Sequence, residues 1–213
     1  MTVPPEAPKP TFADLGVRAE IVESLARKNI THPFPIQAMS LPIAMAGTDM
    51  IGQARTGTGK TLAFGIAVLE QAVVPTDPGY ADLKYPGKPQ ALIMTPTREL
   101  ALQITGDLKD ASQVRHARIL TVYGGVGYEP QLEALESGVD VVVGTPGRLL
   151  DLANRRSLDL SHVKVLVLDE ADEMLDLGFL PDVERLIKGT PETRQTMLFS
   201  ATMPAAIVAL ART

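Results

Sequence analysis

The stretch Ala54-Arg55-Thr56-Gly57-Thr58-Gly59-Lys60-Thr61 decides the fold that we expect for this chain. Its glycines let backbone N–H groups turn inward around a phosphate, and a helix that begins at its end adds the positive end of its dipole. Lys60 can reach the β- and γ-phosphates, and the Thr61 hydroxyl can coordinate Mg²⁺. The general pattern has Gly in the first position, where this chain has Ala54. The stretch therefore predicts a loop that holds the phosphates of a nucleotide.

The segments on both sides of this loop support that interpretation. Residues 49–53 are a plausible short strand, and residues 62–69 have the apolar character of a buried helix. An ordinary glycine-rich turn is the alternative, and the strand–loop–helix setting disfavours it.

Length and composition restrict the class of protein. The 213 residues fit one large α/β domain or two small ones, and 45% hydrophobic residues argue against disorder. No apolar run approaches the ~20 residues that a membrane-spanning helix needs, so we expect no membrane partner. Residues 1–11 are rich in proline and lack the apolar core of a signal peptide, so we expect a flexible tail.

Cysteine usage and charge give two further indications. The chain has no cysteine, which excludes disulfides and thiolate chemistry, and together with the missing signal peptide this favours a cytoplasmic protein. The net charge of −5 neither indicates nor excludes nucleic-acid binding, because a local basic or N–H-rich surface can hold phosphates on an acidic domain.

Strand and helix patterns alternate along most of the chain. Helical periodicity appears at 18–28 and 36–46, and residues 74–90 are expected to form a long surface loop. Further strands are expected at 91–95, 118–123, 139–144, 163–169 and 195–200, and further helices at 98–113, 128–137, 147–153, 182–188 and from Pro204 onward. This alternation, with nearly continuous apolar strands, predicts an α/β domain with a mostly parallel sheet and helices on both faces.

In such a sheet, ligands bind outside the carboxyl ends of the strands. Asp169 ends one predicted strand and Glu170 follows it directly. An acidic residue there can hold the Mg²⁺ shell opposite Thr61, and Glu170 can orient or deprotonate a water aimed at the γ-phosphate. This pair favours hydrolysis over transfer to another acceptor. We therefore predict that Lys60, Thr61, Asp169 and Glu170 converge around one triphosphate–metal ion.

Three more loops are expected at the same edge of the sheet. They are Thr95-Pro96-Thr97-Arg98-Glu99-Leu100, Tyr123-Gly124-Gly125 and Thr145-Pro146-Gly147-Arg148. Thr followed by Pro is ordinary chemistry for the first turn of a helix, so these loops do not need a ligand to explain them. Alternatively, helix N-termini and glycine N–H groups hold successive phosphates, with Arg98 and Arg148 adding charge. The residues alone leave both interpretations open. Only 4% of the residues are aromatic, so a nucleic acid would be recognised by its backbone rather than its bases.

At this point the chain resembles a known family, the DEAD-box ATP-dependent RNA helicases, over residues 12–204. The resemblance is carried by ordered motifs: residues 54–61, Pro96-Thr97-Arg98-Glu99-Leu100-Ala101, Gly124-Gly125, Thr145-Pro146-Gly147-Arg148, Asp169-Glu170-Ala171-Asp172 and Ser200-Ala201-Thr202. Phe12 and the run Ile30-Thr31-His32-Pro33-Phe34-Pro35-Ile36-Gln37 resemble the adenine-reading segment. The 53–64 and 123–128 runs also resemble the bacterial heat-resistant RNA-dependent ATPase of this family.

This resemblance implies a fold, ligands and residue roles. Residues 12–213 would form the N-terminal RecA-like domain, with ATP and Mg²⁺ as cofactors and RNA as the partner. Gln37 would read the adenine edge and Phe12 would pack on its face. The phosphates and Mg²⁺ would be held by Ala54, Arg55, Thr56, Gly57, Thr58, Gly59, Lys60 and Thr61. Asp169 would bind Mg²⁺ through water, and Glu170 would act as the base.

The resemblance also assigns the RNA-facing and coupling residues. Asp172, Ser200 and Thr202 would connect the nucleotide site to closure on RNA. The RNA backbone would lie along Pro96, Thr97, Arg98, Gly124, Gly125, Thr145, Pro146, Gly147 and Arg148. Two departures leave the adenine site open: Phe34 stands where the family usually has Ser or Thr, and Asn29 where it often has Gly.

The second RecA-like domain of the family is not expected within these 213 residues. Because that domain carries the arginine finger in the family, we expect the chain alone to bind nucleotide weakly and to hydrolyse it slowly. The alternatives are a non-catalytic ATP-gated RNA clamp or scaffold, which Glu170 argues against, and a phosphoryl-transferring kinase. A kinase would need an acceptor pocket and an arginine-rich lid, and the sequence has neither.

Overall fold

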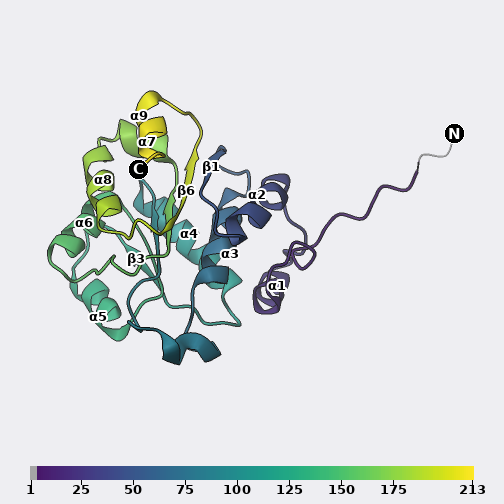
Figure 1. The fold of residues 1–213 in the computed structure, drawn as a ribbon, viewed down its shortest axis with the longest axis horizontal. Coiled ribbons are helices and arrows are strands. Elements are labelled where there is room, and N and C mark those ends of the chain that lie inside the picture. Colours follow the sequence, from purple (N-terminus) through teal and green to yellow (C-terminus); the bar gives the residue numbers. More distant parts are fainter. Residues whose placement is uncertain (1–3) are drawn as a thin grey trace.

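The computed structural model describes residues 4–213, which form one six-stranded sheet with helices on both sides (Figure 1). The strands are β1 (Met50–Gln53), β2 (Ala91–Met94), β3 (Ile119–Val122), β4 (Val141–Gly144), β5 (Val165–Leu168) and β6 (Gln195–Ser200). Their order is β1-β6-β5-β2-β4-β3, and every neighbouring pair is parallel. The predicted α/β fold with a parallel sheet is confirmed.

The helices are α1 (Ala19–Ala26), α2 (Pro35–Met45), α3 (Lys60–Gln71), α4 (Arg98–Ala111), α5 (Glu129–Ser137), α6 (Pro146–Asn154), α7 (Ala171–Asp176), α8 (Leu180–Lys188) and α9 (Ala205–Leu210). Helices α1 and α2 precede the first strand, α9 follows the last, and the others connect successive strands. The expected long loop at 74–90 contains the 3₁₀ helix η1 (Pro78–Asp82) and is otherwise irregular.

The central strands are apolar along their whole length because both of their faces are covered. Every residue of β2, β4 and β5 is buried, whereas β1, at one edge of the sheet, alternates between exposed and partly buried residues. Since successive side chains of a strand point to opposite faces, Ala91 and Ile93 enter one core, and Leu92 and Met94 enter the other.

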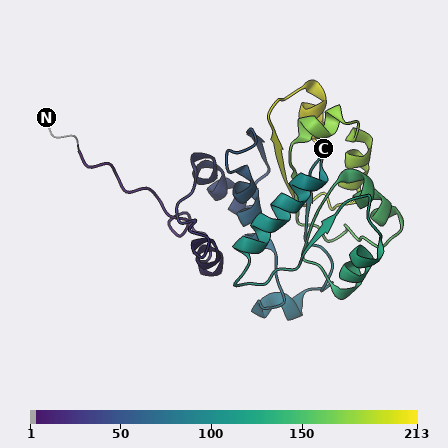
Figure 2. The ribbon, with the colours of Figure 1, turned by 180° about the vertical axis from the view of Figure 1, so that it is seen from behind.

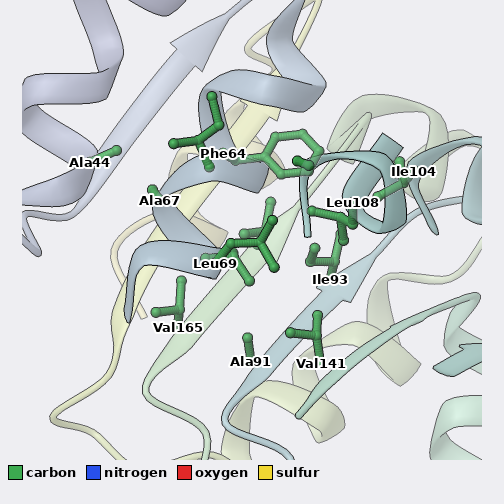
Figure 3. Close-up of a cluster of buried hydrophobic side chains, with 14 of the residues drawn as sticks. Ala44, Phe64, Ala67, Leu69, Ala91, Ile93, Ile104, Leu108, Val141 and Val165 are labelled. Carbon is green, nitrogen blue, oxygen red and sulfur yellow. The ribbon is translucent and has the colours of Figure 1, made fainter. Parts of the chain in front are cut away.

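The two cores belong to different sets of helices. Phe64 and Leu69 of α3 and Leu108 of α4 pack on the strands from one side, together with residues of α1 and α2 (Figure 3). The opposite core contains residues of α6, α7, α8 and α9. Figure 2 shows the same two layers from behind. The carboxyl ends of the strands and the loops that follow them are left for ligands.

The helix boundaries refine two of the predictions. Helix α3 begins at Lys60, so Lys60 and Thr61 lie in its first turn rather than before it. The sequence interpretation missed α7, a helix of 6 residues directly after Glu170, because so short a segment shows no clear periodicity. Asp172 and Glu173 lie in its first turn, where the helix dipole favours acidic residues.

The N-terminal segment departs from the body of the molecule in both views (Figures 1 and 2). Residues 4–10 are exposed and have no regular structure. The first three residues of the predicted tail lie outside the described residues, so its flexibility stays a prediction. Within residues 4–213, the helices are too short or too polar to cross a membrane.

Candidate nucleotide site

The glycine-rich loop connects β1 to α3 and is shaped by its own backbone. Gly57 and Gly59 have φ values of +86° and +84°, a conformation that glycine adopts without steric cost. The Thr58 hydroxyl donates to the Arg55 carbonyl at 2.8 Å, and the Ala54 N–H donates to the Ser200 carbonyl at 3.1 Å. The loop therefore ends at the N-terminus of a 12-residue helix, where free N–H groups favour an anion.

The structure brings Lys60, Asp169 and Glu170 together, although more than 100 residues separate them in the chain. Lys60 Nζ lies 3.0 Å from Asp169 Oδ1 and 3.4 Å from Glu170 Oε1. Glu170 Oε1 also accepts a hydrogen bond from the Thr56 hydroxyl at 2.8 Å. Lys60 is 5% exposed and Asp169 is 2% exposed, so this charge cluster is held away from bulk water.

Glu170 has an unusual backbone conformation in this cluster. Its φ of 53° and ψ of 51° place it in the left-handed region, which costs an ordinary L-residue about 1 kcal/mol or more. This conformation turns the chain from β5 into α7 and places the Glu170 carboxylate at the phosphate loop.

The two carboxylates have opposite pKa shifts. Burial raises the pKa of Asp169 above its ordinary value, and the charge of Lys60 offsets this only in part. Burial also acts to raise the pKa of Glu170, but interactions with Glu173, Thr56 and Lys60 bring it below its ordinary value. The pKa of Glu173 rises because it shares a hydrogen bond with Glu170. The proximity of Glu170 and Glu173 therefore shifts their two pKa values in opposite directions.

Two buried oxygen atoms at this edge of the sheet have few partners among residues 4–213. Asp169 Oδ1 has the ion pair with Lys60 Nζ at 3.0 Å and no other partner, and Thr95 Oγ1 has no hydrogen-bond partner. They follow the paired residues Leu168 and Met94 on adjacent strands, so both side chains face the same side of the sheet as α3. Oxygen atoms with few partners suit Mg²⁺, which binds oxygen ligands and retains several waters. Asp169 and the Thr61 hydroxyl, which lines the same cavity, fit this ion.

A cavity of about 230 Å³ extends from this cluster toward α1 and α4. It contains both polar and apolar walls: Leu25, Ile30, Phe34, Gln37, Thr56, Gly57, Gly59, Lys60, Thr61, Leu62, Leu100, Gln103, Ile104, Asp107, Asp110, Asp169 and Glu170. The structure thus places Lys60, Thr61, Asp169 and Glu170 around one cavity, with Gln37 on its wall. Phe12, by contrast, is 1% exposed within the core and is absent from these walls, so its place on the adenine face stays a prediction.

Gln37 connects α2 to the phosphate loop. Its Nε2 donates to the Gly59 carbonyl at 2.9 Å, and its Oε1 accepts from the Phe34 N–H at 2.9 Å. An amide side chain has two donors and two acceptor lone pairs, so one of each stays available to a ligand.

The three residues expected to couple the nucleotide site to RNA are also in contact. Asp172 Oδ2 accepts hydrogen bonds from the Thr202 N–H at 3.0 Å and the Thr202 hydroxyl at 2.9 Å. The Ser200 hydroxyl donates to the Thr202 carbonyl at 2.7 Å and accepts from the Asp172 N–H at 3.1 Å. This network connects the start of α7 to the end of β6.

The loops expected to contact RNA lie at the carboxyl ends of β2, β3 and β4. Thr97 caps α4, and the Arg98 guanidinium lies 4.7 Å from the Tyr123 ring centroid. Arg148 donates to the Val126 carbonyl at 2.8 Å. Gly124, Gly125 and Gly147 are exposed, Thr145 is partly buried, and Pro96 and Pro146 are buried. The buried prolines begin or precede their helices, so their side chains are less available to a ligand than the glycines are.

Sequence reasoning missed several residues of these sites. Thr95 was placed at a strand end and in a loop but given no role at the site, and no site role was given to Tyr128 or Gln131, which contact Arg148. The strand-end position of Thr95 was the available signal, because the residues before Thr95 and Asp169, Met94 and Leu168, are paired in the sheet. No comparable signal identified Tyr128 or Gln131.

The chain matches known proteins in both sequence and structure. A family model described as DEAD/DEAH box helicase matches residues 34–210. The chain is 47% identical to the ATP-dependent RNA helicase CshA of Listeria monocytogenes over 91% of its length and 35% of the relative. It is 49% identical to the DEAD-box ATP-dependent RNA helicase 9 of Oryza sativa over 90% of its length and 30% of that protein.

A solved structure is similar as well. The crystal structure of a DEAD box protein from the hyperthermophile Methanococcus jannaschii has a TM-score of 0.85 and 37% identity, covering 95% of this chain and 53% of that one. This chain spans about a third of the length of the curated relatives that it matches.

Proposed function

Because this chain belongs to the DEAD/DEAH box helicase family, we propose that it is the ATP-binding RecA-like part of an ATP-dependent RNA helicase. In the whole protein, ATP binding and hydrolysis would be coupled to RNA binding and local duplex unwinding, in the cytoplasm. The observation that carries this proposal is the buried cluster of Lys60, Asp169 and Glu170 beside the phosphate loop.

The roles of the cluster follow from its contacts. The N–H groups at the start of α3 and the Lys60 ammonium would bind the phosphates of ATP. Asp169 and Thr61 would hold Mg²⁺, which supplies charge neutralisation at the β- and γ-phosphate oxygens when it is bound. Glu170, ionised and fixed by Thr56, would accept a proton from the attacking water.

The adenine would lie toward the apolar end of the cavity. Gln37 has one free donor and one free acceptor, which match the amino group and ring nitrogen of adenine. The remaining loops would contact the RNA backbone without reading its sequence. Arg98 and Arg148 add charge there, and the exposed glycines give the backbone close access.

The site would be completed by a second RecA-like domain in the whole protein. The cavity of about 230 Å³ is small for a nucleotide and opens to solvent, which supports a site that another domain covers. We therefore expect this chain by itself to bind ATP weakly, to hydrolyse it slowly and not to unwind RNA. Rapid RNA-stimulated ATP hydrolysis by the 213-residue chain would contradict this.

The alternative is an ATP-gated RNA clamp that does not hydrolyse ATP. Glu170→Gln in the whole protein distinguishes the two, because it removes the base and keeps the size of the side chain. If the protein is a hydrolase, RNA-stimulated ATP turnover should fall by at least about a hundredfold, while binding of ATP, measured by calorimetry, persists. A wild-type protein that binds RNA in response to ATP without turnover would favour the clamp.

A further inference from the structure

Phe34 stands out among the aromatic residues of this chain. Of the five phenylalanines, Phe12, Phe64 and Phe199 are almost completely buried and Phe179 is partly buried, whereas Phe34 is 57% exposed. An exposed apolar side chain needs no special explanation when it stands alone on a surface. Phe34, however, lines the cavity that ends at Lys60 and Asp169.

The ring of Phe34 lies directly on the phosphate loop. A Cβ added to Gly59 would be 2.5 Å from Cδ2 of Phe34, so the ring packs where only glycine leaves room for it. The same construction places the Gln37 amide nitrogen 2.8 Å away. Phe34 and the adenine-reading candidate Gln37 therefore approach Gly59 together.

The backbone holds Phe34 in this place. Pro33 and Pro35 flank it, and proline restricts both its own φ and the conformation of the residue before it. The Phe34 N–H also donates to Gln37 Oε1 at 2.9 Å. An aromatic ring on a preordered backbone loses little conformational freedom when a ligand binds to its face.

The residues that line the cavity favour a particular kind of ligand. The polar end of the cavity is built for phosphates, Leu25 and Ile30 give its other end apolar walls, and the Phe34 ring lies on Gly59 beside Gln37. A ligand that fills both ends has a flat ring joined to a polyphosphate. Phe12, the residue that sequence reasoning assigned to the face of the ring, is buried in the core and does not line the cavity.

We propose that Phe34 is the aromatic platform on which the base of the bound nucleotide stacks, and that it sets the affinity for the base while the phosphate loop sets the affinity for the phosphates. This inference rests on the proposed function. Stacking of a base on an aromatic side chain contributes to affinity, so removing the ring should weaken ATP binding by roughly tenfold.

The test compares ATP with inorganic tripolyphosphate, which has the phosphates and no base. Phe34→Leu should weaken ATP binding by roughly tenfold and leave tripolyphosphate binding unchanged, and Phe34→Tyr should restore ATP binding. Met39→Ala is the matched control, since Met39 is a 75% exposed residue of α2, the helix that Phe34 precedes, and lies outside the cavity. Its ATP affinity should equal that of the wild type. Circular dichroism verifies that every variant is folded.

A second readout reports the contact itself. The chain contains no tryptophan, so Phe34→Trp introduces a single indole whose fluorescence should be quenched by ATP and not by tripolyphosphate. Unchanged or tighter ATP binding in Phe34→Leu, or equal quenching by both ligands, overturns the platform. If the wild-type chain binds neither ATP nor tripolyphosphate, the proposed function is overturned too. If it binds both, and the Phe34 variants bind ATP as tightly as the wild type does, only the platform is overturned and the proposed function survives.

Discussion

Helix α3 carries a buried cation–carboxylate cluster at each end, and the two clusters differ in what they leave unsatisfied. At its N-terminus, Lys60 pairs with Asp169 and Glu170; Asp169 Oδ1 has no partner besides Lys60 Nζ, and Thr95 Oγ1 has none. At its C-terminus, the Arg115 guanidinium donates to the carbonyls of Leu69 and Ala72 and to Asp77.

The C-terminal cluster behaves as a structural cap. Arg115 is 3% exposed, and its hydrogen bonds satisfy carbonyl groups that the end of a helix leaves free. Asp77 also accepts from the Val74 N–H at 2.9 Å and lies near Arg18. Among residues 4–213, the C-terminal cluster leaves one buried donor, Arg115 Nε, without a partner, while the N-terminal cluster keeps oxygen atoms that can bind a ligand. The difference distinguishes a fold-stabilising charge pair from a binding site.

The largest expected effect is the loss of stability when the cluster at the C-terminus of α3 is disrupted by Asp77→Ala. Removing one partner of a buried ion pair costs about 3–5 kcal/mol. Because the Asp77 side chain is 16% exposed, we expect the low end of this range, a fall of roughly 3 kcal/mol in the free energy of unfolding and of roughly 10 °C in Tm. Urea and thermal unfolding measure this. Glu23→Ala removes an exposed partner of Arg27 in an i, i+4 pair and should cost less than about 0.5 kcal/mol. Equal losses in the two variants would contradict the comparison.

Lys60→Met, in the cluster at the N-terminus of α3, should lower the affinity for ATP more than it lowers the stability of the fold. Loss of a hydrogen bond to a charged group costs about 1.5–3 kcal/mol, so the affinity for ATP should fall by roughly ten- to a hundredfold. The stability loss should be smaller than in Asp77→Ala, because Asp169 has a raised pKa and can take up a proton. Calorimetric titration with ATP and urea unfolding separate the two effects. An unaltered ATP affinity would remove Lys60 from the site.

The two ends should also have opposite pH dependence. Burial acts to raise the pKa of Asp77, but the Val74 N–H and Arg115 more than offset it, so its folded pKa is lowered. Its contribution to stability is present above about pH 4 and is lost as pH falls through the folded pKa. The stability gap between wild type and Asp77→Ala should therefore close in acid.

For Asp169 the sign is reversed. Burial raises its folded pKa, so ionisation of Asp169 destabilises the folded state as pH rises through that value. In the absence of nucleotide and Mg²⁺, Asp169→Asn should gain stability relative to wild type with rising pH. Urea unfolding over a pH series measures both gaps, and a parallel trend at the two carboxylates would refute the contrast.

The smallest expected effect concerns two buried threonines. Thr95→Val removes a hydroxyl without a partner, so the stability of the chain without ligand should change by less than about 0.5 kcal/mol or rise. Thr105→Val is its matched control, because the Thr105 hydroxyl is 2.7 Å from that of Thr121, and its loss should cost about 1 kcal/mol. Only Thr95→Val should reduce the benefit of Mg²⁺ for ATP binding, by a few fold. Isothermal titration with and without Mg²⁺ tests this.

The sequence predicts the binding end of α3 much better than the structural end. In a parallel sheet the carboxyl ends of all strands share one edge, so the convergence of Lys60, Asp169 and Glu170 follows from the predicted topology. No comparable sequence pattern predicts the role of Arg115. It follows α4 in an irregular segment, and only the packed structure shows that its guanidinium reaches the end of another helix.

The aromatic residues show the same limit. Phe12 lies before residues 30–37, which resemble the adenine-reading segment of the family, and Phe34 lies within them. The sequence pattern does not tell which of the two rings is buried. Burial depends on how α1 and α2 pack against α3, with Phe12 in the same core as Ile21 and Leu41. Strands fared better, since all six were predicted to within two residues at each end and β6 without error.

The left-handed backbone of Glu170 has a consequence for laboratory evolution of this chain. Glycine at this position would release about 1 kcal/mol of conformational strain. A screen for heat resistance that scores only folding would thus reward the loss of the carboxylate proposed as the base. Variants of this chain selected for thermal tolerance should be assayed for turnover at every round, because a substitution at position 170 that raises thermal stability would also remove the proposed base.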